Sequence, residues 1–369
     1  MTARRLGLVI NPIAGMGGRV GLHGTDGVSL DAARSRGAEP VAARRARRAL
    51  ARLPQDLDLV AAGGVMGADV LDELDRPHAT VYRPGPDATT TAADTRAAVA
   101  ALVQSGVDLV LFAGGDGTAR DVAAALAGSP VPVLGVPSGV KMHSGVFATS
   151  PEAAADTAAR FLADPERVGQ QDADVVDRAT DDSPPTLCGS VRVPALSGGL
   201  QGAKSRTASS DAGGLRELGR EIASRMQAGR LYLLGPGSTV AQVGDALGLR
   251  TTLLGVDAVL DRQLLGSDLD EQSLRELVAE HPGGVLLLGV IGGQGFLLGR
   301  GNQQLSPAVV EAIGAQNVVV LAAASKIAAL DPPVLRVDVG DDEANRPLSS
   351  GYHRVHTGPG RSTVLKIEA

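Results

Sequence analysis

The feature that most constrains the fold of this chain is a series of short apolar runs, each followed by a glycine-containing loop. In the first half they lie at residues 6–10, 57–62, 109–112 and 131–136. Continuous apolar runs of this length are typical of strands buried on both faces of a parallel sheet. Helical stretches are predicted among them, at 66–74, 92–104, 120–127 and 152–162. The alternation predicts a doubly wound α/β domain that binds its ligands at the carboxyl ends of the strands.

The composition changes near residue 164. The segment 164–185 is acidic and contains prolines, and the sequence after it is richer in short strand-like runs and turns. We therefore predict an N-terminal α/β domain at residues 1–168 and a β-rich C-terminal domain at 169–369. The last strand-like run, 363–367, could stay in the second domain or return to the first.

Composition and charge exclude several classes of protein. The net charge is −6 and aromatic residues make up only 2%, unlike the basic faces and stacking platforms that bind nucleic acids. The single cysteine, Cys188, excludes an internal disulfide and a cysteine-based zinc site. The sequence has no apolar run of about 18 residues and no apolar core of a signal peptide near its start. We expect a cytoplasmic protein that binds neither nucleic acid nor a membrane.

The loop Gly-Gly-Asp-Gly-Thr at 114–118 follows a predicted strand and precedes a predicted helix. Its glycines allow the backbone to approach a ligand closely, and amides at a helix N-terminus can bind phosphate. The carboxylate of Asp116 would repel a phosphate, so it needs another function. It could act as a general base on a hydroxyl group or position Mg²⁺. Alternatively, the loop is a tight turn in which Asp116 caps the helix.

The GGDGT loop resembles the signature of the superfamily of NAD kinases, diacylglycerol kinases and phosphofructokinases. Further segments resemble one branch of it, the ATP-NAD kinase-like proteins of bacteria and archaea. These segments are 11–27, 135–148, 235–240, 253–265 and 291–307. Taken in order, they extend the resemblance over about residues 5–330, and their combination is specific although each is weak alone.

The resemblance implies a two-domain kinase that binds NAD and a phosphoryl donor, ATP or inorganic polyphosphate, in the cleft between its domains, with Mg²⁺ as cofactor. It implies that Asp116 is the catalytic aspartate and acts on the ribose 2′-hydroxyl of NAD. Two sets of residues would then lie near the nucleotide. They are the phosphate loop, Gly114, Gly115, Gly117 and Thr118, and the Gly-Ser-Thr element, Gly237, Ser238 and Thr239. Related kinases are commonly homo-oligomers, so a homo-oligomer is expected here.

One departure from the family pattern concerns substrate recognition. Typical NAD kinases carry an Asn-Glu pair that holds the substrate, and this sequence has no clear counterpart. Asp257 or Asp261 could replace it, and the two would share a face if their segment were helical. The departure leaves two alternatives open. One is a kinase for another small hydroxylated metabolite or a lipid, and the other is a non-catalytic dinucleotide-binding regulator of the acetoin-catabolism type.

The remaining candidate ligands lie in other glycine-containing loops. Amides suit the recognition of bases and ribose, and Arg or Lys suits phosphate. The alternative for each loop is an ordered turn without a ligand. The candidates for nucleotide binding are Asn11, Gly15, Gly17, Gly18, Ser138, Lys141, Gln294, Arg300 and Asn302.

Overall fold

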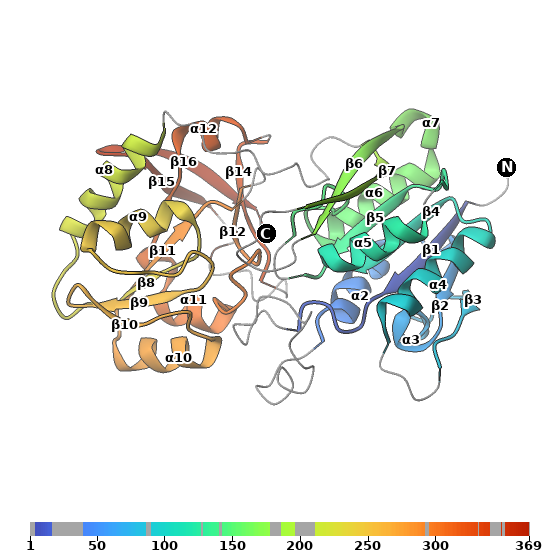
Figure 1. Cartoon of the computed structure of the whole chain (residues 1–369), viewed down its shortest axis with the longest axis horizontal. Helices are drawn as coiled ribbons and strands as arrows, with labels where there is room; N and C mark the ends of the chain where they lie inside the picture. The colour runs from blue at the N-terminus through green and yellow to red at the C-terminus, as the bar shows by residue number, and fades with distance from the viewer. Residues whose placement is uncertain are drawn as a thin grey trace. The chain divides into compact units, whose positions relative to one another are not determined.

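A computed structural model of the chain describes residues 4–16, 40–85, 90–126, 128–139, 142–177, 186–195, 211–291, 295–330, 332–339, 348 and 351–368. The chain forms two compact units (Figure 1). The first holds the elements from β1 to β7, and the second holds those from α8 to β16. Among the described residues, no helix is both long and apolar enough to span a membrane.

The first unit is built on a five-stranded sheet in the order β3-β2-β1-β4-β5, and all its pairs are parallel. The strands are β1 (Arg5–Ile10), β2 (Asp58–Ala62), β3 (Ala79–Tyr82), β4 (Leu109–Gly114) and β5 (Val133–Pro137). The helices are α2 (Ala42–Arg52), α3 (Ala68–Glu73), α4 (Ala92–Gln104), α5 (Asp116–Ala125), α6 (Pro151–Ala163) and α7 (Pro165–Val168). The predicted doubly wound parallel α/β domain is confirmed.

Both faces of this sheet are buried, as the continuous apolar runs predict. In β4, Leu109 and Leu111 pack with residues of α2 and α6, whereas Val110 and Phe112 pack with residues of α4 and α5. Successive side chains of a strand point to opposite faces, so every position of a doubly covered strand must be apolar. The core of this unit therefore lies in two layers, one on each side of the sheet.

A two-stranded antiparallel hairpin completes the first unit. It consists of β6 (Gln170–Asp177) and β7 (Thr186–Pro194), and both strands pack on α5. Ala173 and Val175 of β6 and Val193 of β7 join the core layer that contains Phe112. The first compact unit therefore continues past residue 168, where the sequence places the domain boundary.

The second unit contains a mixed nine-stranded sheet in the order β10-β9-β8-β11-β13-β15-β16-β14-β12. Its strands are β8 (Tyr232–Leu234), β9 (Asp257–Leu260), β10 (Gln263–Gly266), β11 (Val285–Gly289), β12 (Phe296–Leu298), β13 (Val318–Leu321), β14 (Val334–Val337), β15 (Tyr352–Gly358) and β16 (Arg361–Glu368). Its helices are α8 (Asp211–Ser224), α9 (Ser238–Leu247), α10 (Glu271–Glu280), α11 (Pro307–Ile313) and α12 (Ala324–Ala328). The predicted β-rich C-terminal region is confirmed, and its last strand, β16, pairs with β15 and β14 of this same sheet.

Candidate active site

Three loops meet at the carboxyl ends of adjacent strands in the first unit. They follow β1, β4 and β5, which are neighbours in the sheet. From β1 the sheet continues through β2 and β3 on one side and through β4 and β5 on the other. The carboxyl ends of β1 and β4 therefore form the topological switch point, where open α/β sheets bind ligands. The loops contain most of the candidates predicted in this unit, including Asn11, Gly15, Asp116 and Ser138.

Hydrogen bonds join the three loops to one another. The backbone N–H of Asn11 donates to Ala113 O at 2.9 Å, and its side-chain Nδ2 donates to the hydroxyl of Thr118 at 2.9 Å. The N–H of Ser138 donates to Gly114 O at 2.9 Å. The loop after β4 is thus held from both sides, by the β1 loop and by the β5 loop.

The glycines of these loops are required by close backbone contacts. Gly15 has a φ of +81°, and a Cβ there would lie 2.1 Å from Ser138 O. Gly139 packs on Gly115, where a Cβ at Gly139 would lie 2.7 Å from the Gly115 Cα. Any side chain at these positions would separate the loops. The glycine spacing noted in the sequence therefore reflects packing between loops, whether or not they bind phosphate.

Asp116 is the first residue of α5 and is only 8% exposed. Its Oδ2 accepts the backbone N–H of His143 at 2.7 Å, and its Oδ1 accepts that of Ser144 at 3.0 Å. Burial raises its pKa from 3.8 to about 6, although the hydrogen bonds from Ser144 and His143 act in the opposite direction. A buried carboxylate with a pKa near neutrality can take up a proton in a reaction at physiological pH.

The His143–Ser144 segment was not assigned a function toward Asp116 by sequence reasoning. The residues lie in a polar stretch after the β5 loop, and nothing in their spacing indicates that their backbone amides bind a carboxylate 27 and 28 residues away. Arg120 and Asp177 were missed as well. Their pairing depends on where the β6–β7 hairpin packs, which the sequence pattern does not predict.

The Gly-Ser-Thr element lies in the second unit, at the start of α9. Gly237 is the residue before the helix, with a φ of +118°, and its N–H donates to Leu253 O at 2.8 Å. Ser238 and Thr239 form the first turn of α9. The element therefore has the helix N-terminus that phosphate binding requires, and its predicted contact with a nucleotide stays a prediction.

Asp257 is 1% exposed and lies at the start of β9. Its carboxylate accepts the N–H of Thr252 at 2.6 Å, the hydroxyl of Thr252 at 2.8 Å and the N–H of Asp268 at 3.0 Å. These bonds join the segments on both sides of β9. Asp261 follows in a turn with a φ of +50° and accepts the N–H of Gly229 at 2.6 Å. The two aspartates are not on a helix, so the condition under which they would share a face is not met.

The two described candidates of the loop after β12 are also buried. Arg300 forms an ion pair with Asp338 at 3.4 Å and lies 4.7 Å from the ring centre of Phe296. Asn302 is 1% exposed, and it accepts the N–H of Gly299 and donates to Leu297 O, each at 2.8 Å. Both side chains stabilise the loop through these contacts. Their predicted contacts with a ligand stay predictions.

Four predicted ligands lie outside the described residues. They are Gly17, Gly18, Lys141 and Gln294. Within the described part of the chain, no group of three or more His, Cys, Asp or Glu side chains is arranged to hold a metal ion. Proteins usually bind Mg²⁺ through one or two carboxylates together with substrate phosphates, a smaller set of ligands than such a group.

Comparison with family models gives two matches. Residues 6–166 match the ATP-NAD kinase N-terminal domain, and residues 228–367 match the ATP-NAD kinase C-terminal domain. The two matches together cover most of the chain, and each falls mainly in one compact unit. Comparisons with curated proteins and with solved structures found no match.

Proposed function

The chain belongs to the ATP-NAD kinase family, and we propose that it is an NAD kinase. It would transfer a phosphoryl group from ATP or inorganic polyphosphate to the 2′-hydroxyl of NAD, giving NADP. Family membership supports a kinase, that is, a phosphotransferase. The identity of the acceptor and of the donor is the proposal. The observation that carries it is the buried carboxylate of Asp116 at the carboxyl end of the sheet, within the GGDGT loop.

Asp116 is the proposed proton acceptor. As the 2′-oxygen forms a bond to the terminal phosphorus, its proton moves to the Asp116 carboxylate. The bond between that phosphorus and the bridging oxygen breaks, and ADP or a shortened polyphosphate leaves. With a pKa of about 6, the carboxylate is mainly deprotonated at pH 7, and it is more basic than an ordinary aspartate.

The rest of the loop supports charge neutralisation. Phosphoryl transfer requires mainly positioning and electrostatic stabilisation of the phosphate oxygens. The backbone amides at the start of α5 suit this task. Mg²⁺ would arrive with the phosphates of the donor and neutralise part of their charge, and the functions proposed here for the protein groups do not depend on it.

The test is the formation of NADP by the purified chain. NAD, Mg²⁺ and either ATP or polyphosphate are incubated with the protein, and an NADP-specific dehydrogenase detects the product. The Asp116→Asn variant is run in parallel, and its fold is checked by circular dichroism. We expect product from the wild-type chain with at least one donor and almost none from the variant. NADP formation that does not depend on Asp116 would refute its proposed function.

A second candidate function keeps the chemistry and changes the acceptor. It is favoured by the missing Asn-Glu pair and by the three hydrogen bonds that already occupy the carboxylate of Asp257, its suggested replacement. A panel of hydroxylated metabolites and lipids is assayed with ATP labelled at its terminal phosphate. Transfer to NAD alone excludes this candidate. Calorimetric binding of NAD without transfer to any acceptor would instead indicate the non-catalytic regulator.

A further inference from the structure

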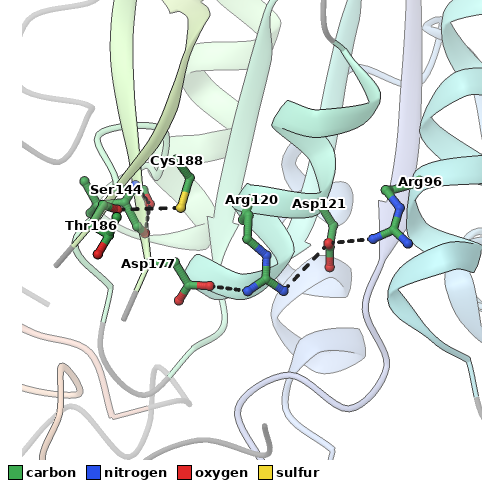
Figure 2. Close-up of polar contacts among 8 residues, drawn as sticks. Arg96, Arg120, Asp121, Ser144, Asp177, Thr186 and Cys188 are labelled. Carbon is green, nitrogen blue, oxygen red and sulfur yellow. Dashed lines mark hydrogen bonds and ion pairs between the residues drawn. The ribbon is translucent and has the colours of Figure 1, made fainter. Parts of the chain in front are cut away.

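A chain of ion pairs joins Arg96, Asp121, Arg120 and Asp177 in the first unit (Figure 2). Arg120 of α5 lies between two carboxylates, donating to Asp177 at the end of β6 and lying 3.7 Å from Asp121. Arg96 of α4 forms an ion pair with the same Asp121 oxygen at 3.0 Å. The chain thus links α4, α5 and the β6–β7 hairpin through their charged side chains.

The end of β6 is also tied to the segment that binds Asp116. The Ser144 hydroxyl donates to Val176 O at 3.0 Å and accepts the Val176 N–H at 3.1 Å, and Ser144 is fully buried. The backbone N–H of the same serine donates to Asp116. Since Val176 directly precedes Asp177, the Asp177 charge and the Asp116 carboxylate are attached to one hydrogen-bonded framework.

The two members of the Arg120–Asp177 ion pair carry opposite charges, and that of Asp177 is among the causes of the raised pKa of Asp116. The Asp177 side chain is only 16% exposed, so solvent screens its charge incompletely, and it contributes to the raised pKa of Asp116. Arg120 lies four residues after Asp116 on α5, a spacing that places the two on one side of the helix. Its cation favours the ionised carboxylate and also neutralises Asp177.

We propose that Arg120 and Asp177 are positioning residues for the catalytic carboxylate: their ion pair sets the charge that Asp116 experiences, and Ser144 keeps that pair at a constant position relative to it. The inference rests on the proposed function, because Asp116 matters to turnover only if it accepts the substrate proton. The electrostatic coupling itself can be measured without turnover.

Other ionisable groups surround Asp116 and must be held constant in a test. None of the variants below alters Asp121 or His143. The groups in the ion-pair chain or in contact with Asp116 are Arg120 and Asp121 on α5, Arg96 on α4, Asp177 on β6 and His143 in the segment after β5. The elements packed on α5 also carry Asp94 on α4, Asp172 and Asp174 on β6 and Arg192 on β7, which the variants leave unchanged.

The test measures the pKa of Asp116 directly, in the full-length chain without substrates. Aspartate carboxyls are labelled with ¹³C and titrated by NMR, and the Asp116 signal is identified as the one lost in Asp116→Asn. Asp177→Asn removes the repelling charge and should lower the pKa of Asp116, whereas Arg120→Gln removes the cation and should raise it. We expect each shift to be about half a pH unit or more, as for unit charges at short range in a partly buried site.

Three controls separate charge from structure. Arg120→Lys keeps the cation and should return the pKa close to that of the wild type. Arg96→Gln alters the far end of the ion-pair chain and should leave it unchanged. The double variant Asp177→Asn/Arg120→Gln should titrate between its two parents. Shifts in the same direction for both single variants, or no shift in either, would overturn the proposal, because loss of structure alone has no reason to act with opposite sign.

Ser144→Ala tests whether Ser144 fixes the position of the Arg120–Asp177 ion pair relative to Asp116. It removes both bonds to Val176 and also the side-chain hydrogen bond that lowers the pKa of Asp116, so Ser144→Ala itself is the reference here. The shift that Asp177→Asn causes relative to this reference should shrink, and an undiminished shift would refute the function of Ser144. If NADP is formed, the acid limb of kcat/KM should move with the pKa in each variant, and an acid limb that stays in place would show that Asp116 is not the proton acceptor. If no acceptor is phosphorylated, the proposed function fails while the NMR shifts still decide the coupling.

Discussion

Two aspartates, one in each compact unit, are buried to a similar degree, and both follow glycine-containing segments. Asp116 is 8% exposed and Asp257 is 1% exposed. Asp116 accepts two backbone N–H groups, both from one segment distant in sequence. Asp257 accepts three donors, which come from Thr252 before β9 and from Asp268 after the β9–β10 hairpin. The same residue type therefore has two different surroundings, and the function proposed for Asp116 does not extend to Asp257.

The difference lies in what the hydrogen bonds accomplish. Around Asp257 the hydrogen bonds connect Thr252 and Asp268 through the carboxylate, which therefore stabilises the conformation of residues 252–268. Around Asp116 they do not compensate for burial, and its pKa rises to about 6. A buried aspartate near glycines is thus not in itself a ligand or a base. The origin and number of its donors separate the two functions.

The largest difference between Asp116 and Asp257 is expected in turnover. Asp116→Asn removes the proposed proton acceptor while keeping the size of the side chain. We expect kcat to fall by about 10²- to 10⁴-fold, the usual contribution of a general base. Steady-state kinetics of NADP formation measures the effect, with Asp257→Asn as the matched substitution at the other buried aspartate. An equal loss of kcat in both variants, when both are folded, would break the comparison.

The next effect is on the pH dependence of stability. The folded chain binds the Asp116 proton more tightly than the unfolded chain, because the pKa is about 6 rather than 3.8. The stability contributed by this group is therefore present below about pH 4 and is lost as the pH rises through 6. Relative to Asp116→Asn, the wild-type free energy of unfolding should fall by up to about 3 kcal/mol between pH 4 and 7.

Urea denaturation of both proteins across this pH range measures that difference. The other titrating groups are common to both chains and largely cancel in the difference. A difference that rises with pH would have the wrong sign for a raised pKa, and it would mean that the hydrogen bonds from His143 and Ser144 outweigh burial at Asp116.

Much of the first unit could be predicted from the sequence. The four apolar runs correspond to β1, β2, β4 and β5, because strands covered on both faces leave an unbroken apolar signature. Other elements gave no such signal. β3 is a short edge strand with no buried residue, and α2 carries five arginines that hide its buried alanines and Leu50. The helix predicted from residue 120 begins at Asp116, because Gly115 before it and Gly117 in its first turn are poor helix formers.

The candidate site could be predicted in part. The loops after β1, β4 and β5 were expected to converge because adjacent parallel strands end at one edge. The partners of Asp116 could not be expected, because they come from backbone amides, which carry no residue-type signal. The ion pair of Arg120 with Asp177 depends on a hairpin that packs on α5 from beyond the predicted boundary.

A smaller effect, on stability, is expected when hydrogen bonds of Asp257 are lost. Asp257→Asn leaves one side-chain oxygen where two accept hydrogen bonds, so at least one buried donor loses its partner. We expect the free energy of unfolding to fall by about 1–3 kcal/mol. Denaturation in urea measures this, and calorimetry with NAD at a temperature where the variant is folded provides the control. A loss of NAD affinity without a loss of stability would make Asp257 a ligand that replaces the missing Asn-Glu pair.

The smallest effect concerns the asparagines that hold the two sets of loops. Asn11 joins the β1 loop to Thr118 and is partly exposed, whereas Asn302 is 1% exposed and bonds to two backbone groups. Water can replace a partner at the first position and not at the second. We expect Asn11→Ala to cost about 0.5–1.5 kcal/mol, and Asn302→Ala about 1–3 kcal/mol. Urea denaturation of the two variants side by side measures the difference. If Asn11→Ala lowers the free energy of unfolding more than Asn302→Ala does, the loops around Asp116 are held as rigidly as those of the second unit. The proposed distinction between Asp116 and Asp257 then depends only on the raised pKa of Asp116.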